Sequence, residues 1–295
     1  MNEKILILTP VYNDWRSLNK LLFKINQIFK KKLKLKFELV IINDCSTENY
    51  DFKKYRFKMI KKITILSLFK NVGSQRAIAI GLKFLNKKYK KKIKTIILDS
   101  DGQDNPRLIP EMLRQSKLNS NYSVVVDRGQ RKEPIWFRVL YEFYCFLVKI
   151  FCAKKIRFGN FSLINFNHLK KISSKKELWS AYPPTILLNI DKLKHITGNR
   201  EKRYVDNSKM NFFGLVLHAL RVFAVLKKRI FFFSIYFFFF LYILYFYDLI
   251  ISLYFNLISI FLMTFNICIN LISLDNKNKF LKNFKKIKIK ILKIN

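Results

Sequence analysis

The sequence predicts an α/β fold whose mostly parallel sheet is followed by an all-α segment. Two observations support this prediction. Over residues 5–126, short apolar and β-branched runs alternate with segments whose apolar residues recur at helical spacing. Over residues 230–272, the chain is almost wholly apolar and long enough for two helices. The 295 residues therefore suit one large domain and a separate helical region.

The first domain is expected to alternate strands with helices. Strands are expected over residues 5–8, 37–42, 63–68, 95–98 and 124–126, and helices over 18–28, 77–85 and from about Leu108 onward. This alternation predicts parallel strands joined by right-handed crossovers. The apolar run within residues 1–10 is too short for a cleavable signal peptide, and we interpret it as the first strand.

Polar side chains follow the carboxyl ends of the expected strands. In open parallel sheets, ligands bind beyond these ends. A purely structural domain does not need so many polar and charged groups at one edge, so the pattern predicts an enzyme. The residues concerned are Asn13, Asp14, Asp44, Asn71, Asp99, Asp101 and Arg128.

Three aspartates, Asp99, Asp101 and Asp104, follow the strand expected at residues 95–98. Carboxylate oxygens suit Mg²⁺ or Mn²⁺, which keep several waters and a substrate phosphate in their shell. The alternative is a polar turn that caps the helix near Leu108. The place of these aspartates within a row of polar strand ends favours the metal site, and hence a nucleotide diphosphate as ligand.

The composition is strongly basic, with 57 Lys+Arg against 19 Asp+Glu and a formal charge of +38. A nucleic-acid binder is one interpretation of such a charge. The lysines are spread over the whole chain, however, as in proteins of AT-rich genomes, and no nucleic-acid-binding module is recognisable. We therefore expect no nucleic-acid partner. The cysteines lack metal or redox spacing and are expected to be free thiols: Cys45, Cys145, Cys152 and Cys268.

The apolar segment predicts two transmembrane helices over residues 230–273, with a break near Asp248. Basic residues flank it on both sides, which places residues 1–210 and a basic tail at 274–295 in the cytoplasm. Residues 211–229 are expected to form an interfacial amphipathic helix. The alternative is a buried helical hairpin in a soluble protein.

Four segments resemble motifs of the family 2 glycosyltransferases of the GT-A fold. They occur in the family's order and on the expected elements. The segments are Thr-Pro-Val-Tyr-Asn-Asp at 9–14, Ile-Ile-Asn-Asp-Cys-Ser-Thr at 41–47, Asn-Val-Gly-Ser-Gln-Arg-Ala at 71–77 and Asp-Ser-Asp-Gly-Gln-Asp-Asn-Pro at 99–106. The resemblance implies a Rossmann-like GT-A catalytic domain over residues 1–210.

Three later segments resemble the bacterial polyprenyl-phosphate or dolichol-phosphate mannosyltransferase-like branch. They are residues 126–131, residues 159–162, and Arg203 with residues 207–210. A two-helix membrane tail is also typical of bacterial members, so the resemblance implies that the hairpin lies in a bacterial inner membrane. The chain departs from the family pattern at four positions, where many members have Asp, Gly, Asp and Arg: Asn43, Cys45, Asn160 and Ser162.

The resemblance implies an inverting hexosyltransferase that uses Mg²⁺ or Mn²⁺ in cell-envelope biosynthesis. It would move a sugar from a nucleoside-diphosphate-sugar to a membrane polyprenyl phosphate, and a homo-oligomer is compatible with bacterial relatives. An acceptor phosphate is already anionic, so no general base is required. One alternative is a saccharide acceptor in cell-surface polysaccharide synthesis, and another is a membrane-anchored basic binding protein without activity.

The resemblance also implies roles for individual residues. The metal would be held by Asp99, Asp101 and Gln103. The donor would be bound by Pro10, Tyr12, Asn13, Asp44, Asn71, Gly73 and Asp99. The acceptor phosphate would be bound by Arg128, Arg131, Arg203, Ser208 and Lys209. Asp99, Asp101, Arg128 and Arg131 would be catalytic, and so would Asp104, as a base for a hydroxyl acceptor; otherwise Asp104 is expected to cap the next helix.

Overall fold

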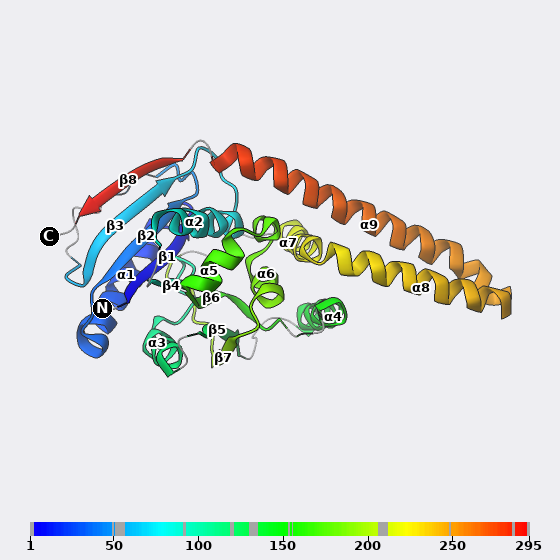
Figure 1. The fold of residues 1–295 in the computed structure, drawn as a ribbon, viewed down its shortest axis with the longest axis horizontal. Coiled ribbons are helices and arrows are strands. Elements are labelled where there is room, and N and C mark those ends of the chain that lie inside the picture. Colours follow the sequence, from blue (N-terminus) through cyan, green and yellow to red (C-terminus); the bar gives the residue numbers. More distant parts are fainter. Residues whose placement is uncertain are drawn as a thin grey trace. The chain divides into compact units, whose positions relative to one another are not determined.

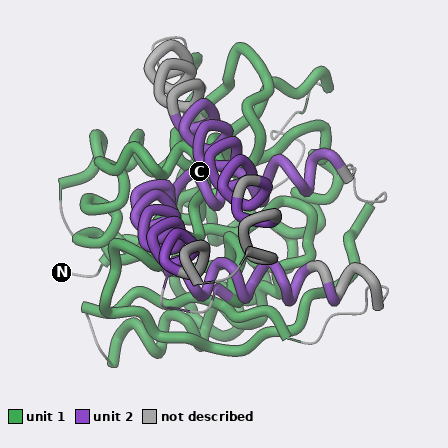
Figure 2. Tube along the Cα trace, turned by 90° about the vertical axis from the view of Figure 1, so that its right-hand side faces the viewer, with its two compact units in different colours: residues 1–132, 157–209, 280–295 green, residues 133–156, 210–279 purple. Residues whose placement is uncertain are grey.

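The computed structural model describes residues 3–48, 50, 57–90, 93–118, 121–129, 135–152, 154, 156–205, 212–247, 249–284 and 287–293. The chain divides into two compact units, shown in different colours in Figure 2. The sheet unit comprises residues 1–132, 157–209 and 280–295, and the helical unit comprises residues 133–156 and 210–279. This division differs from the expected single domain over 1–210, because residues 133–156 group with the later helices.

The sheet unit contains an eight-stranded mixed sheet (Figure 1) in the order β7-β5-β6-β4-β1-β2-β3-β8. Its strands are β1 Lys4–Val11, β2 Phe37–Asn43, β3 Ile60–Ser67, β4 Ile93–Ile97, β5 Ser123–Arg128, β6 Phe158–Asn165, β7 Leu193–Gly198 and β8 Lys288–Lys293. Strands β1 to β4 pair in parallel, as do β5 and β7. Strand β6 is antiparallel to both of its neighbours, and β8 is antiparallel to β3. The five expected strands are therefore present, and three further strands complete the sheet.

Strand β8 changes the interpretation of the basic C-terminal segment. Residues 274–295 were expected to form a tail, but Lys288–Lys293 pairs along the edge of β3, with Ile291 opposite Thr64. Figure 1 shows the two strands side by side. The alternation of lysine with isoleucine suits an edge strand, because charged side chains on an edge discourage further pairing.

Helices cover both faces of the sheet. The described helices of this unit are α1 Trp15–Ile28, α2 Ser74–Lys88, α3 Ile109–Leu118, α5 Phe166–Ser173 and α6 Tyr182–Asn189, with short turns η1 Phe29–Leu33, η3 Pro106–Leu108 and η4 Lys176–Trp179. On one face, Leu21 of α1 and Met112 of α3 share a core with Ile7. On the other face α2 packs closely, because a Cβ at Gly81 would lie 2.5 Å from Leu8.

The helical unit consists of α4 Ile135–Cys152, α7 Phe212–Val225 and α8 Lys227–Tyr247, together with most of α9 Leu249–Phe284. The ring of Phe223 contacts Tyr144 at 5.8 Å and Phe265 at 5.7 Å between centroids. Arg229 Nη1 donates to the carbonyl oxygen of Cys152 at 2.9 Å, which satisfies the end of α4. Within the described part of the chain, no helix has both the length and the apolar character needed to cross a membrane. The expected transmembrane pair over 230–273 is therefore not confirmed.

Candidate functional site

The candidate site lies where the parallel strands β1, β2 and β4 end. Because these strands are parallel neighbours, their carboxyl ends meet at one edge of the sheet. The loop after β4 carries the three aspartates, and the loops after β1 and β2 lie beside it. Pro10, an expected donor-binding residue, still lies within β1, opposite Ile42 of β2.

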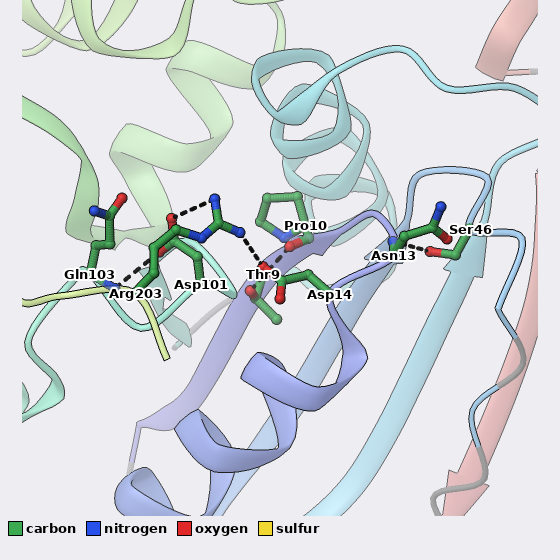
Figure 3. Close-up of polar contacts among 8 residues, drawn as sticks. All are labelled: Thr9, Pro10, Asn13, Asp14, Ser46, Asp101, Gln103 and Arg203. Atoms are coloured by element: carbon green, nitrogen blue, oxygen red, sulfur yellow. Dashed lines mark hydrogen bonds and ion pairs between the residues drawn. The ribbon is translucent and has the colours of Figure 1, made fainter. Parts of the chain in front are cut away.

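The loops after β1 and β2 are joined by Asn13. Its backbone has a positive φ of 47°, which asparagine tolerates better than most residues. Its Oδ1 accepts from the backbone N–H of Thr47 at 2.9 Å, and its own N–H donates to Ser46 Oγ at 3.0 Å, as Figure 3 shows for Ser46. Asn13 therefore shapes the expected donor side of the site, whereas Tyr12 next to it is 41% exposed.

Asp44 has a different surrounding from the one expected of a donor-binding carboxylate. It is 2% exposed, and its two oxygens accept from the backbone N–H groups of Val72 at 2.7 Å and Gly73 at 2.8 Å. The same Gly73 N–H also lies 3.1 Å from Asn71 Oδ1. Burial raises the pKa of Asp44, and the two N–H donors and Arg76 partly offset this. Asp44, Asn71 and Gly73 thus brace the loop after β3.

Hydrogen bonds hold two of the three aspartates, Asp99 and Asp104, in place. Asp104 Oδ2 accepts from the backbone N–H of Asp99 at 3.0 Å, and Asp99 Oδ1 accepts from Asn160 Nδ2 at 2.9 Å. Asp104 was expected to cap the next helix if it was not a base. The cap is instead Asn105, whose Oδ1 accepts from Arg107 N–H at 3.0 Å, which leaves Asp104 to face back toward the strand end.

Arg203 lies between two of the acidic side chains (Figure 3). Its Nη2 lies 2.7 Å from Asp14 Oδ2, and its Nη1 lies 3.8 Å from Asp101 Oδ2. The expected role of Arg203 was to bind an acceptor phosphate. Because its guanidinium is already paired with Asp14, we interpret it as a residue that links the loops after β1 and β4.

A segment after β7 folds across the loop that carries the aspartates. Tyr204 N–H donates to the carbonyl oxygen of Asp101 at 3.1 Å, and Glu201 N–H donates to that of Gln103 at 2.9 Å. Gly102 has a positive φ of 81°, and a Cβ there would lie 2.2 Å from the Tyr204 ring. The position therefore requires glycine both for its backbone and for this contact.

Burial and the proximity of the three aspartates raise the pKa of two of them. Burial and the neighbouring Asp99 raise the pKa of Asp101. Burial and Asp99 also raise the pKa of Asp104, to about 7. Such crowding raises the affinity for protons and, by the same attraction, for a divalent cation.

Two arginines lie near this cluster. The Arg128 guanidinium lies against Gly159, where a Cβ would be 2.3 Å from its Nη2. The side chain of Arg200 is exposed, yet partial desolvation and the charge of Arg128 lower its pKa. Sequence reasoning missed Arg200, because the strand that ends at Gly198 just before it was not expected. The other expected acceptor ligands, Arg131, Ser208 and Lys209, lie outside the described residues.

Two carboxylates of the cluster, those of Asp99 and Asp101, are suitable ligands for Mg²⁺ or Mn²⁺. Within the described ranges, no three His, Cys, Asp or Glu side chains are grouped to hold an ion by themselves. Asp99 and Asp101 suffice for Mg²⁺, which usually takes one or two carboxylates and completes its shell with water and substrate phosphates. Gln103 contacts Asp101 through its backbone N–H at 3.0 Å, so its role as an expected ligand stays a prediction.

The chain matches the model of Glycosyl transferase family 2 over residues 6–197. Among solved structures, it is similar to glucosyl-3-phosphoglycerate synthase from Mycobacterium tuberculosis in complex with Mn²⁺ and uridine-diphosphate-glucose (TM-score 0.53, 13% identity, 77% of this chain and 79% of that chain). The same enzyme in complex with Mn²⁺, uridine-diphosphate and glucosyl-3-phosphoglycerate gives a TM-score of 0.51 at 14% identity, covering 77% of this chain and 80% of that chain.

A further similar structure is S. aureus TarS 1-349, with a TM-score of 0.47 and 15% identity over 77% of this chain. The matched region spans 65% of that chain, and 39% of a longer TarS chain. The family model covers well over half of the present sequence and includes the ends of β1, β2 and β4. The protein therefore belongs to glycosyl transferase family 2.

Proposed function

We propose that the protein is an inverting, metal-dependent glycosyltransferase that transfers a sugar from a nucleoside-diphosphate-sugar to polyprenyl phosphate. The observation that carries this proposal is the crowded carboxylate cluster at the end of β4, with Arg128 and Arg200 near it. The carboxylates suit a metal-bound diphosphate, and the two arginines suit a second phosphate. The fold likeness to an enzyme crystallised with Mn²⁺ and uridine-diphosphate-glucose supports the donor class.

The donor side follows from the loops after β1 and β4. Asp99 and Asp101 would hold Mg²⁺ or Mn²⁺, which supplies a Lewis acid for the departing diphosphate. Asn13 and Asp44 keep the loops in place behind the nucleoside rather than contacting it through free carboxylate or amide oxygens. The exposed ring of Tyr12 is then the group of this turn that is available to the nucleoside.

The acceptor side rests on the two arginines. A phosphate monoester is anionic at neutral pH and attacks without a general base, so it needs orientation rather than deprotonation. Guanidinium groups match phosphate oxygens with paired N–H donors. Arg200 takes the place that was assigned to Arg203, because Arg203 is engaged by Asp14.

A lipid acceptor is supported by the surface of the helical unit. Its helices α8 and α9 expose many large apolar side chains, including Phe232 (58%), Tyr236 (74%), Phe261 (65%) and Met263 (67%). Large exposed apolar side chains in such number are typical of a surface that contacts a membrane or another protein. We propose that this surface keeps the sheet unit at the cytoplasmic face of a bacterial inner membrane, where polyprenyl phosphate is available.

The test is transfer of radiolabelled sugar by membranes that contain the full chain, with Mn²⁺ and a series of nucleotide sugars. We expect label in the organic-extractable lipid fraction. Asp101→Asn should lose this label, whereas Asp191→Asn, at an exposed aspartate outside the site, should keep it. Label that appears only in water-soluble products would instead support a saccharide acceptor, and no transfer from any donor by folded protein would refute the proposal.

A further inference from the structure

We infer that Gln75 and Asn160 are positioning residues, which hold Asp99 in one orientation as a metal ligand through a chain of side-chain amides. The chain begins at the backbone N–H of Tyr182, which donates to Gln75 Oε1 at 2.8 Å. Gln75 Nε2 donates to Asn160 Oδ1 at 2.7 Å, and Asn160 Nδ2 donates to Asp99 Oδ1 at 2.9 Å. The inference rests on the proposed function for the metal role of Asp99.

The direction of every bond in this chain follows from its first donor. A backbone N–H can only donate, so the Gln75 oxygen must face Tyr182 and its NH₂ group must face Asn160. The Asn160 oxygen is then the acceptor, and its NH₂ group must point to Asp99. Both amides therefore have one orientation, and Asp99 always receives a donor at Oδ1. A donor at this position fixes the orientation of the Asp99 carboxylate.

The chain is built into the core rather than laid on the surface. Asn160 is 6% exposed and Tyr182 is fully buried. The backbone of Asn160 is held as well, because Ser162 Oγ donates to its carbonyl oxygen at 2.9 Å and lies 2.6 Å from Tyr182 Oη. Buried polar groups that are all satisfied form stiff networks, so this arrangement restricts the position of Asp99.

This geometry explains why residue 160 is an asparagine, whose side chain both accepts and donates a hydrogen bond. An aspartate at position 160 would have no side-chain N–H to donate and would add negative charge beside Asp99. With asparagine, one oxygen of Asp99 is occupied and its other oxygen remains for a cation that demands regular geometry. Hydrogen-bond partners of a metal ligand affect affinity by roughly 10–100-fold when removed.

The test measures Mn²⁺ affinity of the full-length protein in the presence of uridine diphosphate, by electron paramagnetic resonance of free Mn²⁺. We expect Asn160→Leu to weaken Mn²⁺ binding by about 10–100-fold. Gln75→Met should weaken it by a smaller factor, because Gln75 reaches Asp99 through Asn160. The matched control is Gln115→Met in α3. Gln115 Nε2 donates to Glu111 Oε1 of the same helix at 2.7 Å, so this substitution also removes one amide hydrogen bond. It should bind Mn²⁺ like the wild type.

The double variant distinguishes a chain from two separate contacts. If Gln75 acts through Asn160, the double variant binds Mn²⁺ no more weakly than Asn160→Leu alone. Additive losses, or unchanged affinity in both single variants with a wild-type melting temperature, would overturn the inference, as would a wild type that binds no Mn²⁺. If Asn160→Leu fails to fold, Gln75→Met decides alone. Wild-type Mn²⁺ binding without sugar transfer would refute the proposed function and leave the positioning role standing.

Discussion

Asp44 and Asp101 both lie in loops that follow parallel strands, after β2 and after β4, yet their surroundings differ. Burial raises the pKa of both. Asp44 has a backbone N–H donor on each oxygen, at 2.7 Å and 2.8 Å. Asp101 has one such donor, from Gln103, and the neighbouring Asp99 repels its charge. The first carboxylate is satisfied by the fold, whereas the second still favours a cation.

This contrast shows that an aspartate at a strand end is not by itself a ligand. A carboxylate whose oxygens both accept from the backbone ties two loops together and has little capacity left for a substrate. A carboxylate among other carboxylates is costly to the fold without a counterion, which is typical of functional sites. Substitutions at the two positions should therefore change different properties of the protein.

Asp101→Asn is expected to have the largest effect on activity. Loss of a metal ligand should lower sugar transfer by more than the roughly 100-fold that an outer partner costs. Because the substitution removes charge from a crowded cluster, the melting temperature without metal should stay the same or rise. Enzyme assays at saturating Mn²⁺ and thermal melting in EDTA measure the two effects. Full activity in the variant would remove Asp101 from the metal site.

Asp44→Asn should instead act on stability. An amide offers one oxygen where the native carboxylate offers two, so the N–H of Val72 or that of Gly73 would face an NH₂ donor instead of a carboxylate oxygen. The free energy of unfolding should fall by about 1–3 kcal/mol. Urea denaturation beside Asp101→Asn makes the comparison direct. If Asp44→Asn left stability unchanged but abolished donor binding, Asp44 would be a ligand after all.

Arg200 and Arg203 should also differ in whether their substitution affects activity or stability. Arg200→Gln should raise the KM for a phosphate acceptor by roughly 10-fold or more, because a charge-assisted hydrogen bond is lost. Arg203→Gln should lower the free energy of unfolding, because it leaves Asp14 without its partner at 2.7 Å. It should leave that KM near the wild-type value. Steady-state kinetics with varied acceptor measure the KM, and urea denaturation measures the free energy of unfolding. A raised KM in Arg203→Gln and an unchanged KM in Arg200→Gln would contradict these roles.

A further expected effect is a pH dependence of the free energy of unfolding in the metal-free protein. The pKa of Asp104 is raised from 3.8 to about 7 in the folded state, so the folded chain holds a proton that the unfolded chain has lost. The free energy of unfolding should therefore fall as the pH rises from about 4 to about 7. Asp104→Asn should flatten this slope, measured by urea denaturation in EDTA. An unchanged slope would show that the carboxyl titrates normally.

Much of the sheet unit was predictable from local pattern. The five expected strands are present, because β-branched runs bounded by polar turns carry their own signal. Strands β6 and β7 were missed, and with them the segment that brings Arg200 and Arg203 to the site. Strand β8 was taken for a tail because its lysines suggested a basic flank of the membrane helices, while its pairing partner β3 lies more than 200 residues earlier in the chain.

The sequence by itself determined the alternation of strands and helices, the cluster of three aspartates after β4 and the membership of the family. Only the tertiary structure decided which polar group serves which purpose: Asp44 and Arg203 as links, Asn105 rather than Asp104 as the cap, and Asn160 as the donor to Asp99. The physical reason is that strand and helix signals are local, whereas the use of a polar atom depends on its partner. For Asp99, the residues that set its orientation lie at positions 75, 160 and 182, which only folding brings together.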